Sequence, residues 1–125
     1  DKTQQLIADA RLQVLAGEDA QIFHNLCLGG AGAITAAAQV CPEAFMAMFK
    51  ALKAGQLSEG RRWQHLLSPA IRALFAEPNP ALIKGELAEQ GLGTSVVRSP
   101  LLAGSSIAQP HCTQVLQDLK STTLA

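Results

Sequence analysis

The stretch "LQVLAGEDAQIFHNLCLGGAGAITAAA", residues 12–38, decides the fold, because its hydrophobic pattern changes period twice. Short apolar runs at 12–17 and from Gly32 onward are typical of strands that are buried on both faces. The segment between them, from Asp19 to Gly29, has the length of a helix and ends in glycine, a preferred helix stop. Two strands joined in this way predict a parallel sheet inside an α/β fold.

The segments on both sides of this stretch are predicted to be helical. Residues 3–10 read as the end of a short amphipathic helix, and "CPEAFMAMFKALKAG", residues 41–55, reads as a helix with Pro42 in its first turn and Gly55 at its stop. Two strands alone would leave unpaired edges and an uncovered face. We therefore expect further strands of the sheet to precede this chain.

The second half is predicted to be all-helical, which divides the chain into residues 1–55 and residues 56–125. After Gly55, apolar side chains recur at three- and four-residue spacings, as on one buried face of a helix. Pro69 lies within this pattern, and we expect it to kink the helix or break it at Ser68.

Two further helices are expected after this one. A short helix follows the turn "EPNP", residues 77–80, and stops at Gly91. A last amphipathic helix, residues 111–120, follows a Gly/Ser/Pro linker that runs from Gly104 to Pro110.

Composition limits the classes of function. The chain has 125 residues, 48% of them hydrophobic, which is enough for one domain or one piece of a larger one. Ten basic and ten acidic residues cancel, so neither nucleic acid nor an anionic membrane is an expected partner. No apolar run approaches the ~18–20 residues that span a bilayer, and the first residues lack the features of a signal peptide. We expect a soluble, cytoplasmic protein that binds a small molecule or another protein.

The cysteines and histidines do not predict a metal site or a cofactor. The three cysteines show neither the spacing of a disulfide framework nor that of zinc ligands, and we expect buried or idle thiols at Cys27, Cys41 and Cys112. Three histidines fall on separate predicted helices, without ligand spacing, at His24, His65 and His111.

The motif "AGEDA", residues 16–20, places a glycine and two carboxylates where a strand ends and a helix begins. Gly17 could leave room for a ligand close to the backbone. Asp19 has two interpretations: it caps its own helix, or it orients a substrate, as Glu18 also could. The glycines at 29–32 close a helix and open a strand, so they predict a tight turn rather than a phosphate-binding loop.

Taken in order, four motifs resemble the dihydrodipicolinate synthase and N-acetylneuraminate lyase family of pyruvate-using class I aldolases. They are "VLAGEDA", "LGGAGAIT", "LFAEPNPALIK" and "GLGTSVVRSPL", and with the segments between them they extend from about Arg11 to Leu102. The resemblance implies the C-terminal part of a (β/α)₈ TIM barrel. Its seventh strand would be residues 12–17, its eighth residues 33–38, and a helical C-terminal extension would follow.

The resemblance also implies which functional residues this chain carries. The lysine that forms a Schiff base with pyruvate, and the catalytic tyrosines, would lie upstream of Asp1, so the chain holds no catalytic residue and should be inactive in isolation. Gly17 and Ile34 match positions beside the pyruvate. Lys84 belongs to the "EPNP" motif, and with Glu77 it forms either a structural pair or two solvated charges. Asn79 is expected to cap the next helix, with Pro80 at its first position.

Two alanines limit the range of candidate substrates. Sialic acid lyases carry a glutamate at the position of Ala20 and a serine at that of Ala36, and both groups bind sugar hydroxyls. Their loss favours a lyase-class synthase of lysine biosynthesis that condenses pyruvate with aspartate semialdehyde. The alternatives are a 2-keto-3-deoxy sugar acid aldolase of the same family and a non-catalytic half-barrel module. By analogy with the family we expect no cofactor and a homo-oligomer, namely a tetramer.

Overall fold

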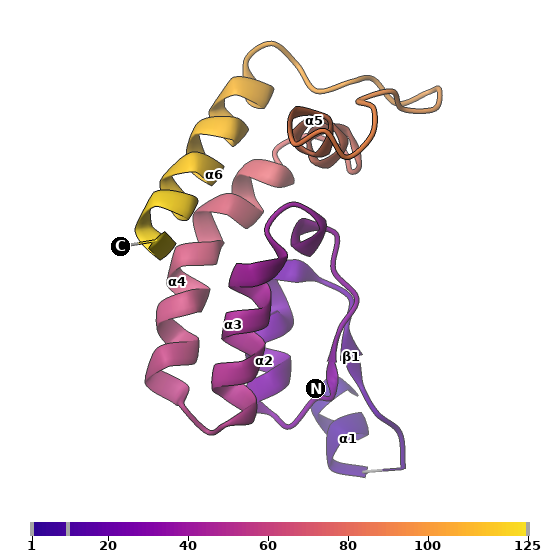
Figure 1. Ribbon diagram of the computed structural model, residues 1–125. Coiled ribbons are helices and arrows are strands. Elements are labelled where there is room, and N and C mark those ends of the chain that lie inside the picture. The colour runs from indigo at the N-terminus through magenta and orange to yellow at the C-terminus, as the bar shows by residue number, and fades with distance from the viewer. Residues whose placement is uncertain (1, 10, 125) are drawn as a thin grey trace.

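A computed structural model describes residues 2–9 and 11–124 of the chain (Figure 1). Strands β1 (Leu15–Ala16) and β2 (Gly32–Ala33) form a parallel pair, in which Leu15 lies opposite Gly32 and Ala16 opposite Ala33. The helix α2 (Ile22–Cys27) connects them. The predicted parallel strand–helix–strand unit is therefore confirmed.

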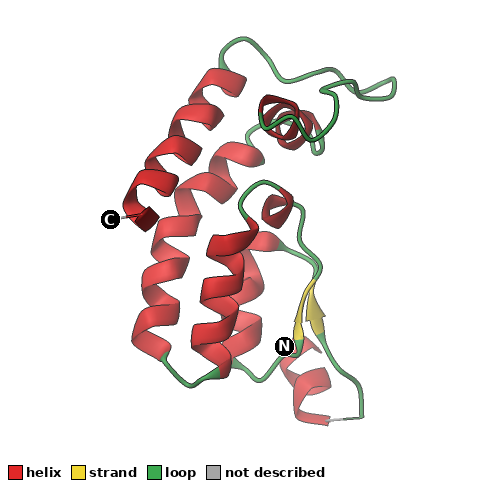
Figure 2. Cartoon of the chain, in the orientation of Figure 1, coloured by secondary structure: helices red, strands yellow, loops and turns green. Residues whose placement is uncertain are grey.

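Helices make up most of the remaining chain, as Figure 2 shows in red. Three predicted glycine stops are confirmed, because each glycine has a positive φ, at Gly29 (98°), Gly55 (73°) and Gly91 (75°). Besides α2, the helices are α1 (Lys2–Asp9), α3 (Pro42–Lys53), α4 (Leu57–Leu74), α5 (Ala81–Glu89) and α6 (Ala108–Leu124), with single 3₁₀ turns η1 (Asp19–Gln21) and η2 (Ala37–Gln39).

Both strands are shorter than the apolar runs that predicted them. A strand persists only where a neighbour pairs with it, and each strand here has one such neighbour. One backbone hydrogen bond extends the pairing at each end, from Ala31 N–H to the Val14 carbonyl (2.9 Å) and from Ile34 N–H to the Ala16 carbonyl (2.8 Å). After Ile34 the chain turns into η2 instead of continuing as a strand.

A kink or a break was expected at Pro69, and the break at Ser68 is wrong, because α4 continues through Pro69 to Leu74. Proline lacks the N–H that would bond the carbonyl four residues earlier, and this loss normally destabilises a helix interior. Here the flanking residues Leu67 and Ala70 are buried, at 0% and 1% exposure, while Pro69 itself is exposed. Burial of one helix face outweighs the missing hydrogen bond.

The turn before α5 differs from its prediction. Pro80, not Asn79, occupies the N-cap position, and it makes no side-chain capping hydrogen bond. Asn79 thus lies one residue too early to reach the free N–H groups of α5. The last helix begins at Ala108 rather than His111, so the predicted linker ends before Pro110, which lies in the first turn.

One hydrophobic core joins the two predicted parts of the chain. Helix α4 packs against α3 on one side and against α6 on the other (Figure 1). Five large side chains in the interior are fully buried, namely Met48, Leu67, Leu74, Leu82 and Cys112. Within residues 2–9 and 11–124, no helix combines the length and hydrophobicity needed to cross a membrane.

Candidate functional site

Gly17 and Ile34, the two predicted binding residues, lie side by side at the carboxyl ends of the strands. Each directly follows the paired residues Ala16 and Ala33. A Cβ atom added at Gly17 would meet nothing within 4 Å, and the Ile34 side chain is 74% exposed. The loops after parallel strands carry the ligand-binding residues in α/β folds. The structure brings the two residues together, and their contact with a ligand stays a prediction.

Asp19 does not cap its own helix, so the first interpretation of this residue is wrong. Glu18 holds the cap position of η1 without a side-chain hydrogen bond. Asp19 is 3% exposed, and its carboxylate accepts hydrogen bonds from the next strand–helix loop instead. The donors are the Thr35 hydroxyl and the backbone N–H groups of Ala37 (2.7 Å) and Ala36 (3.4 Å).

Thr35 was not identified from the sequence as a site residue. Its only sequence signal is a hydroxyl directly after Ile34, in a run that is otherwise alanine. Sixteen residues separate it from Asp19, so local pattern rules could not pair the two side chains. Parallel pairing of β1 with β2 places their following loops at one edge, and this geometry brings Thr35 to Asp19.

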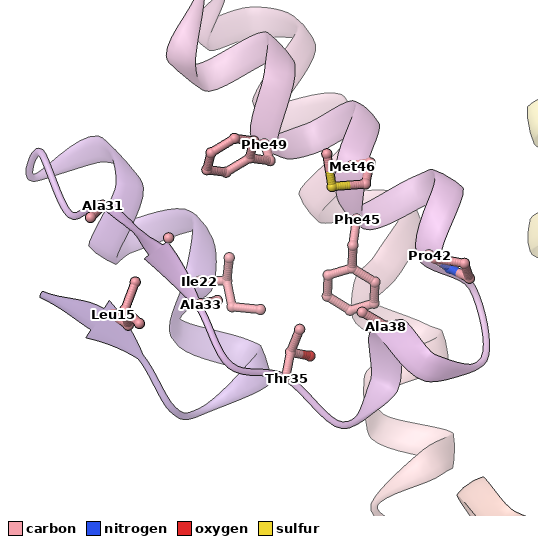
Figure 3. Close-up of a pocket in the computed structure, with 11 residues that line it drawn as sticks. Leu15, Ile22, Ala31, Ala33, Thr35, Ala38, Pro42, Phe45, Met46 and Phe49 are labelled. Atoms are coloured by element: carbon pink, nitrogen blue, oxygen red, sulfur yellow. The ribbon is translucent and has the colours of Figure 1, made fainter. Parts of the chain in front are cut away.

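An apolar hollow of about 350 Å³ lies beside β2 (Figure 3). The side chains of Phe45, Met46 and Phe49 face it from α3, as Figure 3 shows. Met46 is 47% exposed there, whereas Met48 on the same helix is fully buried. Met48 and Phe45 belong to the hydrophobic core.

A second hollow of about 300 Å³ lies beside β1, and Gly17 and Glu18 line it. The Asn25 side chain also lines it and is 5% exposed, and its Oδ1 atom has no hydrogen-bond partner within the described part of the chain. Leu15 of β1 lines both hollows, and in the described part of the chain each strand has one paired edge and one open edge.

Lys84 lies outside this arrangement. It is half-buried on α5 and lines neither of the two hollows beside the strands. Glu77 accepts the backbone N–H of Ser105 (3.0 Å), and hydrogen bonds from Ser105 hold the pKa of this carboxyl below its ordinary value. Glu77 therefore connects the start of α5 to the segment before α6.

The thiols and imidazoles do not converge on a site. Burial raises the pKa of Cys41 and of Cys112 to about 12, which leaves both thiols protonated and unreactive at neutral pH. Cys27 is exposed. The histidines lie on separate helices, α2, α4 and α6, and no cluster of three or more metal-ligating side chains occurs among residues 2–9 and 11–124.

Fold and site together define an α/β protein of the parallel strand–helix class, with its candidate binding residues after adjacent strands. Within this class, the chain belongs to the dihydrodipicolinate synthetase family, whose model matches residues 2–119. It is 36% identical over 104 residues to 4-hydroxy-tetrahydrodipicolinate synthase of Leuconostoc mesenteroides, which covers 83% of this chain and 36% of that protein.

Solved structures support the same assignment. The dihydrodipicolinate synthase of Thermotoga maritima superposes with a TM-score of 0.90 at 28% identity, over 96% of this chain and 42% of that one. A structure described as the first monomeric dihydrodipicolinate synthase variant gives a TM-score of 0.88 at 28% identity, over 93% and 40%. The chain spans less than half the length of these relatives.

Proposed function

We propose that this chain is the C-terminal portion of a class I, Schiff-base-forming and pyruvate-dependent synthase, similar to 4-hydroxy-tetrahydrodipicolinate synthase. Residues 1–55 would supply the seventh and eighth strands of a TIM barrel, and residues 56–125 the helical extension after it. The longer protein that would contain the chain is called the parent protein below. Family membership over residues 2–119 supports the proposal.

The observation that carries the proposal is the position of Gly17 and Ile34 between two open strand edges. Ile34 is 74% exposed and Leu15 49% exposed, although both belong to apolar runs. Strands of the upstream half would cover these side chains and close the two hollows. The carboxyl ends of the completed barrel would then form a pocket in which Gly17 and Ile34 face pyruvate.

The chemistry is divided between the two halves of the parent protein. A lysine upstream of Asp1 would condense with the pyruvate carbonyl and release water, and the resulting imine would accept the electrons left when the methyl carbon loses a proton. The enamine so formed would attack the aldehyde carbon of the second substrate. Gly17 leaves the space for pyruvate that a Cβ atom would occupy, and Ile34 excludes water from the imine.

The second substrate that we propose is aspartate semialdehyde. Ala20 and Ala36 offer no side-chain group to a polyhydroxylated sugar, and a site built to bind hydroxyls can discriminate by ~10⁴–10⁵ against a substrate without them. A short aldehyde needs no such groups. By analogy with the family, we propose that the parent protein is a homo-oligomer.

The test is reductive trapping of pyruvate on the parent protein with borohydride, followed by an aldehyde panel. We expect a covalent adduct in the parent protein and in its Lys84→Ala variant, none in isolated residues 1–125, and the fastest turnover with aspartate semialdehyde. Absence of the adduct in the parent protein, or its loss in a folded Lys84→Ala variant, would contradict the mechanism. N-acetylneuraminate as the best substrate would contradict the specificity, and 2-keto-3-deoxygluconate would indicate the sugar acid aldolase.

A further inference from the structure

Asp19 belongs to the loop after β1, but its carboxylate is bonded entirely within the loop after β2. Its Oδ1 atom accepts the Thr35 hydroxyl and the Ala37 N–H at 2.7 Å, and its Oδ2 atom faces the Ala36 N–H at 3.4 Å. The three donors are consecutive in sequence and begin directly after Ile34. Asp19 therefore satisfies the free N–H groups at the start of η2, as a capping residue from another loop.

This bonding fixes the relative position of the two candidate binding residues. Asp19 follows Gly17 by two residues, and Thr35 follows Ile34 by one. A hydrogen-bonded link between Asp19 and Thr35 thus closes a short ring, whose other members are the paired strand ends. Charge-assisted hydrogen bonds are shorter and about twice as strong as neutral ones, so the ring resists displacement of Ile34.

The same bonding argues against a direct chemical role for Asp19. The carboxylate is 3% exposed, and Oδ1, its better-placed oxygen, already accepts two hydrogen bonds. A general base needs a free lone pair within reach of the substrate proton. Thr35 lines the apolar hollow beside β2 (Figure 3), but its hydroxyl proton is donated to Asp19.

We propose that Asp19 and Thr35 act as a pair of positioning residues that hold Ile34 against the pyruvate adduct. The proposal rests on the proposed function and adds to it a residue pair outside the binding positions. Displacement of a reacting group by about 1 Å can reduce a rate by ~10²-fold. Loss of the link should therefore lower kcat for the condensation while the KM for pyruvate and the yield of trapped adduct change little.

The experiment compares Thr35→Val with a matched control in the helical extension of the parent protein. Thr35→Val keeps the shape of the side chain and removes the hydroxyl that donates to Asp19. Thr113→Val makes the same change at a hydroxyl that donates to the buried carboxylate of Glu86 (2.7 Å). Both variants are measured for kcat, KM for pyruvate, adduct yield and midpoint of urea unfolding.

We expect Thr35→Val to lower kcat by about tenfold or more at unchanged adduct yield. The conservative variant Thr35→Ser, which keeps the donor, should return kcat to within about twofold of the original value. Thr113→Val should shift the unfolding midpoint without lowering kcat. Asp19→Asn keeps one acceptor oxygen but loses the charge, and it should lower kcat several-fold, which supplies a second test if Thr35→Val does not fold.

Equal kcat values for Thr35→Val and Thr113→Val would overturn the proposal, because the link would then be structural only. An unchanged kcat in folded Asp19→Asn would overturn it as well. A parent protein that traps no pyruvate at all would refute the proposed function, and the positioning role would fall with it. That outcome is distinct, since it is observed before any variant is made.

Discussion

Two buried carboxylates, Asp19 beside the strands and Glu86 among the last helices, are hydrogen-bonded by different kinds of donor. They are 3% and 4% exposed, and each accepts hydrogen bonds from a second segment of the chain. Asp19 takes two of its three donors from the backbone. Glu86 takes both of its donors from side chains of α6, namely Gln109 (2.5 Å) and Thr113 (2.7 Å).

The difference shows what each carboxylate controls. Backbone donors fix the conformation of a loop, so Asp19 sets where the residues after Ile34 lie. Side-chain donors fix how two helices face each other, so Glu86 sets the contact between α5 and α6. Gln109 fits there because Gly85 lacks a side chain, since a Cβ atom would lie 2.0 Å from Gln109 Oε1. Changes at Glu86 should therefore affect stability, whereas changes at Asp19 should affect the candidate site.

The largest effect on stability is expected from Glu86→Ala in the parent protein. The change leaves the Gln109 and Thr113 donors without their shared acceptor and opens space in the core, at a cost of about 3 kcal/mol in the free energy of unfolding. Glu89→Ala on the same helix is the control, because Glu89 is exposed. Urea unfolding measures both. Equal midpoints for the two variants would mean that Glu86 does not hold α6.

A smaller effect is expected at Gly30, in the turn before β2. A Cβ atom there would lie 1.8 Å from Asn25 Oδ1 and 2.7 Å from the Asn25 carbonyl, which itself accepts the Gly30 N–H at 2.8 Å. We expect Gly30→Ala to destabilise the parent protein by about 2 kcal/mol through this clash. A Cβ atom at Gly17 would meet no other atom of the described chain within 4 Å, so Gly17→Ala should change the free energy of unfolding by less than about 0.5 kcal/mol.

Gly17 and Gly30 also allow an effect on pyruvate binding to be distinguished from an effect on stability in the strand region. If Gly17 borders the pyruvate pocket, Gly17→Ala should weaken pyruvate binding at a nearly constant urea midpoint, and Gly30→Ala should lower the midpoint with normal affinity in the folded fraction. Calorimetric titration with pyruvate supplies the affinity. Normal affinity in both variants would remove Gly17 from the candidate site.

The sequence predicted those features that depend on neighbouring residues. The helix stops at Gly29, Gly55 and Gly91 follow from the rare backbone conformation that glycine adopts. The lengths of the strands were not predicted correctly, because a strand ends where its partner ends. The apolar side chains after Ala33 do not indicate where that pairing stops. The link from Asp19 to Thr35 was also missed, since it depends on which loops the folded sheet brings together.

The absence of a helix break at Pro69 has a related cause. Helix propensity is a local rule, and burial of Leu67 and Ala70 on one face of α4 is a property of the whole fold. A proline in a helix interior destabilises the helix by about 3 kcal/mol. Burial of several large side chains stabilises it by about 1.5–3 kcal/mol each, and their sum exceeds the cost of the proline. Motif order, by contrast, indicated the family correctly, because it does not depend on element boundaries.

The smallest effect concerns the buried thiols, one in each region of the comparison. Burial raises the pKa of Cys41, which precedes α3, and of Cys112, on α6, to about 12. A raised pKa means that the folded state retains the proton while the unfolded state loses it. The contribution of each buried thiol to the free energy of unfolding is thus fully present below the ordinary thiol pKa of about 9. It is lost as pH rises toward 12, by about 1 kcal/mol per thiol and pH unit.

The exposed Cys27 supplies a control for accessibility in a thiol-labelling experiment. We expect Cys41→Ala and Cys112→Ala each to reduce the loss of stability between pH 9 and pH 10.5. Labelling by a thiol reagent then compares the regions directly. Because Cys41 and Cys112 belong to one hydrophobic core, they should become labelled at the same rate, through a single opening event. Faster labelling of Cys112 would show that α6 detaches on its own, and that the Glu86 contacts are the weaker of the two carboxylate links.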